Sequence, residues 1–117
     1  MSKFTIYHNP RCSKSRATLA LLQENGIEPK IVPYLETRPD ESLLADLLEK
    51  LGMSPGQLVR RGEKAYKAIG LSAESSETDI LAAMAADPIL IERPIVVRGE
   101  RAVLGRPPEN VLELINP

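Results

Sequence analysis

The residue in this chain best suited to covalent chemistry is Cys12, its single cysteine, in the segment NPRCSKSR at residues 9–16. The segment follows a run of β-formers and precedes a helical pattern, which places Cys12 at the first turn of a helix. A helix N-terminus carries partial positive charge and unpaired N–H groups, so it stabilises a thiolate and binds anions. Cations and hydroxyls surround the thiol: Arg11, Lys14, Arg16, Ser13 and Ser15. The sequence therefore predicts a nucleophilic thiol beside an anion site. A small buried structural cysteine is the alternative, and it fits this cationic setting less well.

The cysteine count narrows the chemistry. One Cys and one His exclude an internal disulfide and a structural Cys/His zinc site. Ser15 stands where a C-x-x-C motif would have its second cysteine, so no internal thiol can resolve an adduct on Cys12. Only three residues separate Cys12 from Arg16, unlike the C-x5-R spacing of phosphatase loops. The single histidine, His8, is a candidate general base, or it simply caps or lines the end of a strand.

Composition limits the class of protein. Basic and acidic residues number 15 and 16, and this balance argues against non-specific nucleic-acid binding. The hydrophobic content of 43% and charged content of 26% are ordinary for a soluble domain. The N-terminus lacks the apolar core of a signal peptide, and no apolar run is long enough for a membrane span. We expect a soluble, cytoplasmic protein with no membrane partner.

The elements that must position Cys12 follow from hydrophobic periodicity and turn residues. Strands are predicted over residues 4–7, 27–35, 94–98 and 101–104. Pro29 and Pro33 make the second of these an edge or bulged strand. Helices are predicted over residues 13–25, 40–51, 64–69 and 76–86, from Ser54-Pro55 through Arg61, and from Pro107 onward. The order β-α-β, a helical block, then β-β-α is close to a thioredoxin-like order with inserted helices. We predict one α/β domain over residues 1–117 with a helical insertion at about 38–90.

Arginines at the junctions between predicted elements are the second group of residues that could take part in chemistry. Arg93 and Arg106 each precede a proline, at a strand start and a helix start respectively. Arg60 and Arg61 fall at the predicted end of a short helix, where a favourable interaction with the helix dipole would explain them. All of them are ordinary surface arginines unless they converge. If they do, their guanidinium forks suit a tetrahedral oxyanion.

These residues together resemble one family. The chain is similar to the ArsC family of glutaredoxin-linked arsenate reductases, and most to its short YfgD-like branch. The resemblance covers essentially the whole chain, in order. The matching segments are YHNPRCSKSR at residues 7–16, YLE at 34–36, ERPIVV at 92–97 and GRP at 105–107.

The resemblance implies a thioredoxin-like fold and a set of site residues. The catalytic cysteine would be Cys12, and the family's three anion-binding arginines fall on Arg60, Arg93 and Arg106. Arg60 and Arg61 are adjacent, so only alignment with the family decides which of the two corresponds to the family's arginine. The family's thiolate-stabilising histidine and serine fall on His8 and Ser15. Pro94 matches the proline that is cis in thioredoxin-like folds.

The implied activity is reduction of arsenate to arsenite through an adduct on the Cys12 thiolate. Glutathione would attack that adduct as a co-substrate, glutaredoxin would reduce the mixed disulfide, and no metal or bound cofactor is required. Ser13-Lys14 departs from the small residues that follow the cysteine in characterised reductases of this type. Two alternatives remain: a monothiol glutathione-dependent oxidoreductase without arsenate activity, and an Spx-like regulator that binds RNA polymerase. We expect a monomer that does not bind nucleic acid.

Overall fold

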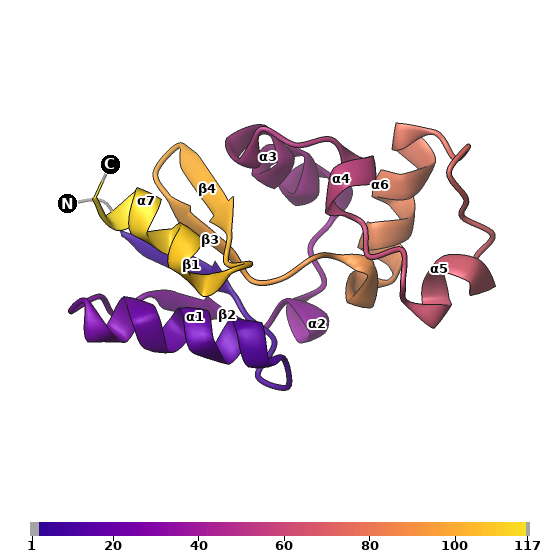
Figure 1. Cartoon of the computed structure of the whole chain (residues 1–117). Helices are drawn as coiled ribbons and strands as arrows, with labels where there is room; N and C mark the ends of the chain where they lie inside the picture. Colours follow the sequence, from indigo (N-terminus) through magenta and orange to yellow (C-terminus); the bar gives the residue numbers. More distant parts are fainter. Residues whose placement is uncertain (1–2, 117) are drawn as a thin grey trace. The chain divides into compact units, whose positions relative to one another are not determined.

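The computed structural model describes residues 3–116 (Figure 1). The chain divides into two compact units. One is the continuous stretch Leu35–Glu92, and the other combines the residues up to Tyr34 with those from Arg93 onward. Cys12, Arg93 and Arg106 therefore belong to the sheet-containing unit and Arg60 to the continuous one.

A mixed β-sheet forms the centre of the sheet-containing unit. Its strands are β1 (Phe4–Tyr7), β2 (Lys30–Val32), β3 (Ile95–Arg98) and β4 (Arg101–Leu104). They lie in the order β2-β1-β3-β4, with β1 parallel to β2 and antiparallel to β3. The helices are α1 (Ser13–Glu24), the 3-10 helix η2 (Pro108–Val111) and α7 (Leu112–Ile115). This is the β-α-β and β-β-α order that the sequence predicts.

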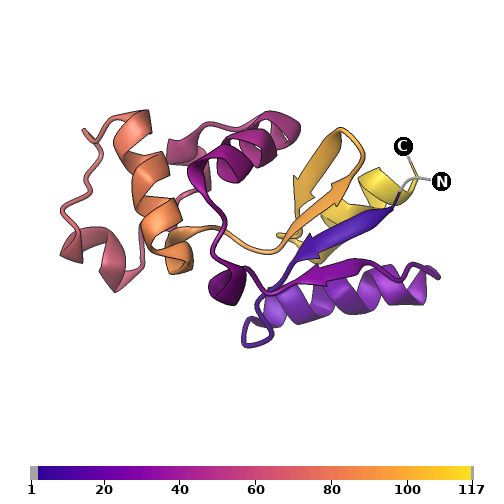
Figure 2. The same ribbon diagram turned by 180° about the vertical axis from the view of Figure 1, so that it is seen from behind.

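One apolar core holds this unit together. Side chains from β1 and β3 pack with α1, η2 and α7, and all are buried. The cluster consists of Phe4, Ile6, Leu22, Val96, Val111 and Leu114. Figures 1 and 2 show α1 and α7 on the same face of the sheet. Since α1 packs through Leu22 on this core, the position of its N-terminus, and thus of Cys12, is tied to the sheet.

The second predicted strand is shorter than expected. The sequence predicts an extended segment over residues 27–35, but β2 spans only Lys30–Val32, and Tyr34–Thr37 forms the short helix α2. Pro33 explains the difference, because it has no N–H to continue the strand ladder and its fixed φ suits the entry to a helix. The predicted edge position of the strand is confirmed.

Helices make up most of the continuous unit. Besides most of α2, they are α3 (Glu41–Leu51), α4 (Pro55–Leu58), α5 (Lys64–Ala68), α6 (Glu77–Ala86) and the 3-10 helix η1 (Pro88–Leu90). Side-chain and glycine caps bound α3: the Asp40 carboxylate accepts from the Leu43 N–H at 2.8 Å, and the helix ends at Gly52 with φ of +68°. The core of the unit is apolar and includes Leu44, Leu47, Leu58, Ile80, Met84 and Leu90. The division into an insertion and a single host domain stays a prediction.

The segment after α4 corrects the sequence-based interpretation of Arg60. The helix ends at Leu58 rather than Arg61, and Val59 forms an antiparallel bridge with Ile91. The Arg60 N–H donates to the Leu90 carbonyl at 2.7 Å, which continues this pairing. Arg60 therefore lies in an extended segment, and the predicted helix-dipole role is wrong. The buried, β-branched Val59 favours the extended pairing.

Among residues 3–116, no helix combines the length and apolar composition needed to cross a bilayer.

Candidate active site

Cys12 is the N-cap residue of α1, at the helix start that the sequence predicts. Its own N–H donates to the Asn9 carbonyl at 3.0 Å, and its carbonyl accepts the Arg16 N–H at 3.0 Å. The preceding loop is held by further bonds, from the Arg11 N–H to Asn9 Oδ1 at 3.0 Å and from Arg16 Nη1 to the Pro10 carbonyl at 2.9 Å. Cys12 is partly exposed. A fixed loop thus presents an accessible sulfur at a helix N-terminus.

The surroundings of the sulfur favour the thiolate. Burial alone would raise the pKa of the Cys12 thiol, but donors near the sulfur outweigh it and hold that pKa below its ordinary value. These donors are the backbone N–H of Ser15, the Arg93 guanidinium and the backbone N–H of Lys14. The charge of Arg93 adds to its hydrogen bond. The groups that lower the pKa of the thiol are thus a helix N-terminus and a cation.

Arg93 and Arg106 meet at the ends of two paired strands. The β3–β4 ladder runs to Ile95 opposite Leu104, and the Gly105 N–H donating to the Pro94 carbonyl at 2.9 Å extends it by one step. Each arginine precedes a proline through a cis peptide bond, which confirms the expectation for Pro94.

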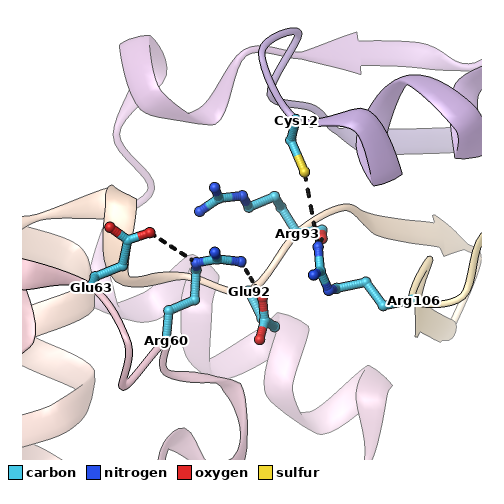
Figure 3. Close-up of polar contacts among 6 residues, drawn as sticks. All are labelled: Cys12, Arg60, Glu63, Glu92, Arg93 and Arg106. Carbon is cyan, nitrogen blue, oxygen red and sulfur yellow. Dashed lines mark hydrogen bonds and ion pairs between the residues drawn. The ribbon is translucent and has the colours of Figure 1, made fainter.

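The Arg106 side chain reaches toward the thiol from this strand end. Its Nη1 lies 3.9 Å from Cys12 Sγ and 3.3 Å from the Arg93 carbonyl oxygen, to which it donates. Figure 3 shows the Arg106 guanidinium directed at the sulfur. The structure thus brings together three of the predicted site residues, Cys12, Arg93 and Arg106.

His8 and Ser15 form a buried pair beside this group. His8 Nδ1 lies 2.7 Å from Ser15 Oγ, which also accepts the Asn9 N–H at 3.0 Å. Burial, and next the charge of Arg16, lower the pKa of His8 below its ordinary 6.5, which favours the neutral ring. The Ser15 side chain therefore holds the loop, while its backbone N–H favours the thiolate. The described hydrogen bond of the His8 ring is with Ser15.

Arg60 occupies a different setting in the continuous unit. Its Nε lies 3.2 Å from Glu63 Oε1 and its Nη1 lies 2.5 Å from Glu92 Oε1, as drawn in Figure 3. Burial would lower the pKa of Arg60, but Glu92 and Glu63 outweigh it and raise that pKa. The neighbouring Arg61 is exposed and donates to the Gly56 carbonyl at 3.3 Å. The two adjacent arginines thus differ sharply in their partners.

Sequence reasoning missed both carboxylates that hold Arg60. Glu63 is three residues further along, but that spacing carries meaning only in a helix, and Arg60 is not helical. Glu92 is distant in sequence, and the Val59–Ile91 bridge makes it a neighbour. Within residues 3–116, no three His, Cys, Asp or Glu side chains gather where they could hold a metal ion.

A cysteine of lowered pKa at a helix start, with guanidinium groups beside it and a sheet of order β2-β1-β3-β4, is the arrangement of a thioredoxin-like protein. The family model described as "ArsC family" matches residues 7–114. The chain therefore belongs to the ArsC family, and the predicted family and fold class are confirmed.

Individual relatives resemble the chain over nearly its whole length. The "Uncharacterized protein YfgD" of Escherichia coli K12 is 55% identical, over 94% of both chains. The "Arsenate reductase" of Neisseria meningitidis serogroup B is 46% identical, over 95% of this chain and 97% of the relative. The solved structure of the "Arsenate reductase from Vibrio cholerae" superposes with a TM-score of 0.92 at 48% identity, covering 96% of this chain and 97% of the other.

Proposed function

We propose that this protein is an arsenate reductase that works through Cys12. The observation that carries the proposal is the lowered pKa of the Cys12 thiol beside Arg93 and Arg106. Guanidinium groups next to a thiolate can hold an oxyanion within reach of a nucleophile. The similarity to proteins named arsenate reductase supports arsenate as that oxyanion.

The chemical step begins with attack on arsenic. The Cys12 thiolate forms a sulfur–arsenic bond to arsenate, and one arsenate oxygen leaves as water after protonation. Arg93 and Arg106 stabilise the charge on the remaining oxygens as the bond forms. We include Arg60 as a third anion-holding arginine, on the family resemblance. This step leaves arsenic as As(V), bonded to the protein.

Reduction needs a second thiol, and none exists in the chain. We propose that glutathione supplies it. As arsenite leaves, two electrons pass to arsenic and the two sulfurs end as a Cys12–glutathione disulfide. Glutaredoxin then exchanges with this disulfide and returns the Cys12 thiol. Because these reduced thiols are characteristic of the cytoplasm, the reaction would take place there.

The test is turnover in a coupled assay. Arsenate, glutathione, glutaredoxin, glutathione reductase and NADPH are combined with the protein, and NADPH oxidation is followed. We expect arsenate-dependent oxidation with wild type and none above background with Cys12→Ser. No other thiol of the chain can replace the nucleophile in this variant, because Cys12 is the single cysteine. Absence of Cys12-dependent turnover with arsenate would refute the proposal.

The same assay separates the remaining candidates. A monothiol oxidoreductase would reduce a glutathione mixed disulfide in a Cys12-dependent way but show no arsenate-dependent turnover. An Spx-like regulator would be captured by RNA polymerase in a pull-down, whereas the proposed enzyme would not. Arg106→Ala sharpens the first distinction, because Arg93 but not Arg106 is among the groups that lower the pKa of the Cys12 thiol. An oxyanion site would need Arg106, whereas thiol exchange by a monothiol oxidoreductase would depend on it far less.

A further inference from the structure

A buried hydroxyl connects the segments that carry the site. Thr18 lies in the second turn of α1, the helix that Cys12 caps, and its side chain is fully buried at 0% exposure. Its Oγ1 lies within hydrogen-bond distance of two carbonyl oxygens, that of Lys14 at 2.8 Å and that of Gly105 at 3.2 Å, and its single hydrogen is shared between them. A buried hydroxyl is expected to be hydrogen-bonded, but a bond to its own helix would already satisfy it. The second bond reaches a segment 87 residues away.

The Lys14 bond acts on the peptide next to the thiol. The Lys14 carbonyl and the Ser15 N–H belong to the same peptide group, and that N–H favours the Cys12 thiolate. A donor on a peptide oxygen strengthens the N–H of the same group as a donor, since hydrogen bonds in chains polarise one another. The Thr18 hydroxyl is therefore linked to the sulfur through one peptide plane.

The hydrogen bond from Thr18 to the Gly105 carbonyl holds the segments that carry the two arginines. Gly105 directly precedes Arg106, and its N–H donates to the carbonyl of Pro94, which directly follows Arg93. A bond from α1 to the Gly105 carbonyl thus joins the helix that carries Cys12 to the strand ends that carry both arginines. The contact is close: a Cβ on Gly105 would lie 2.4 Å from Thr18 Oγ1 and 2.8 Å from Pro94 Cγ. Only glycine fits there.

We propose that Thr18 is a positioning residue for the site, whose hydroxyl fixes the Cys12 end of α1 against the Gly105–Arg106 segment. The inference rests on the proposed function in taking Cys12 as the nucleophile and Arg106 as an oxyanion ligand. Thr18 itself touches neither the sulfur nor the anion. It acts by setting the geometry in which Cys12 and Arg106 meet.

Thr18→Val tests the hydroxyl with little change in shape. We expect the alkylation rate of Cys12 by iodoacetamide below pH 7 to fall roughly two- to threefold, because the thiolate loses support. Protection of Cys12 from alkylation by inorganic phosphate should require several-fold more phosphate. The kcat/KM for arsenate should fall about tenfold, since small misplacements of reacting groups have large effects. Thr18→Ala, which adds no bulk, serves as a second variant if valine is not accommodated.

Two controls separate positioning from stability. Thr18→Ser keeps the hydroxyl, and we expect it to restore the alkylation rate and phosphate protection to near wild type. Leu22→Val shortens a buried side chain on the same helix, away from the site. It should lower Tm without changing the pH profile of alkylation.

The outcomes are decisive in both directions. If Thr18→Val or Thr18→Ala matches wild type in alkylation and phosphate protection, the proposal is wrong. It is equally wrong if Thr18→Ser is as impaired as Thr18→Val, because the hydroxyl is then not responsible. Alkylation and phosphate protection need no arsenate turnover. If they follow the expected pattern while wild type fails to reduce arsenate, the proposed function fails and the role of Thr18 stands.

Discussion

The two units use arginine in opposite ways. In the sheet-containing unit, the Arg106 side chain contacts the Cys12 sulfur and the Arg93 carbonyl. In the continuous helical unit, Arg60 is held between the carboxylates of Glu63 and Glu92. The first arrangement directs positive charge at a thiolate and the place where an anion would sit. The second offsets a positive charge with two negative ones.

The difference arises from how each unit presents its arginine. Arg106 closely follows a strand whose partner is preceded by Arg93 and Pro94, so the two arginines meet at one end of the β3–β4 hairpin. Arg60 lies in an extended segment paired with the residues just before Glu92. In both units, charged residues lie at the end of a pair of extended segments. In the sheet-containing unit these residues are two arginines, and in the continuous unit they form an ion pair. The identity of the opposing residue decides the charge balance.

The sharpest test of this comparison is Arg106→Ala. We expect kcat/KM for arsenate to fall roughly 100- to 1000-fold, the usual effect of removing one donor from an oxyanion site. We expect Arg93→Ala to lower kcat/KM for arsenate by a factor in the same range. The coupled assay with arsenate measures both. Arg101→Ala removes an exposed arginine from the start of β4 and should leave turnover unchanged. An Arg106→Ala enzyme as active as Arg101→Ala would remove Arg106 from the site.

Arg60→Ala should have a smaller effect, because its carboxylate partners already offset its charge. We expect about a tenfold fall in kcat/KM, below the usual range for an oxyanion donor. We also expect a loss of stability of about 1 kcal/mol, since the ion pairs are partly exposed. Steady-state kinetics and urea unfolding give the two values.

Arg61→Ala is the matched control for Arg60, since Arg61 is the exposed neighbour with a backbone carbonyl as its partner. It should be close to wild type in turnover and stability. If Arg60→Ala were to lower kcat/KM as strongly as Arg106→Ala, the contrast between the two units would not extend to function. If Arg61→Ala proved more harmful than Arg60→Ala, the family-based assignment of Arg60 would be wrong.

Local signals explain what the sequence predicts well. The strand at residues 4–7, the helices predicted over 13–25 and 76–86 and the strands predicted over 94–98 and 101–104 depend on neighbouring residues, and the structure has an element at each place. The helix-start position of Cys12 follows from the same kind of signal. The cation at the thiolate, Arg93, is identified through the family resemblance, and the structure places it there.

Long-range pairing explains what the sequence does not predict. Val59 pairs with Ile91, and this bridge brings Glu92 to Arg60 and ends α4 before the arginines. Thr18 has the sequence setting of an ordinary helix residue, and only the fold brings Gly105 to it. Neither contact has a local pattern, because each depends on segments that meet only after the chain has folded.

Arg93→Ala should also change the titration of the thiol, through a smaller effect than that on turnover. The variant loses a hydrogen bond and a positive charge near Cys12, so the pKa of the thiol should move up toward its ordinary value. The alkylation rate at a fixed pH below 7 should fall several-fold. A pH series of iodoacetamide alkylation measures the shift. An unchanged profile would mean that the helix N-terminus alone supports the thiolate.

The smallest expected effect is on stability as a function of pH. Because the folded pKa of Cys12 lies below the unfolded value near 9.0, ionisation of the thiol favours the folded state. This contribution is fully present above the unfolded pKa and is lost as the pH falls through the folded pKa. The difference in Tm between wild type and Cys12→Ser should therefore change in favour of wild type as pH rises through this window. Arg93→Ala should reduce that change, since it brings the folded pKa closer to the unfolded one. A change in the opposite direction would mean that burial, which raises the pKa, outweighs the donors around the sulfur.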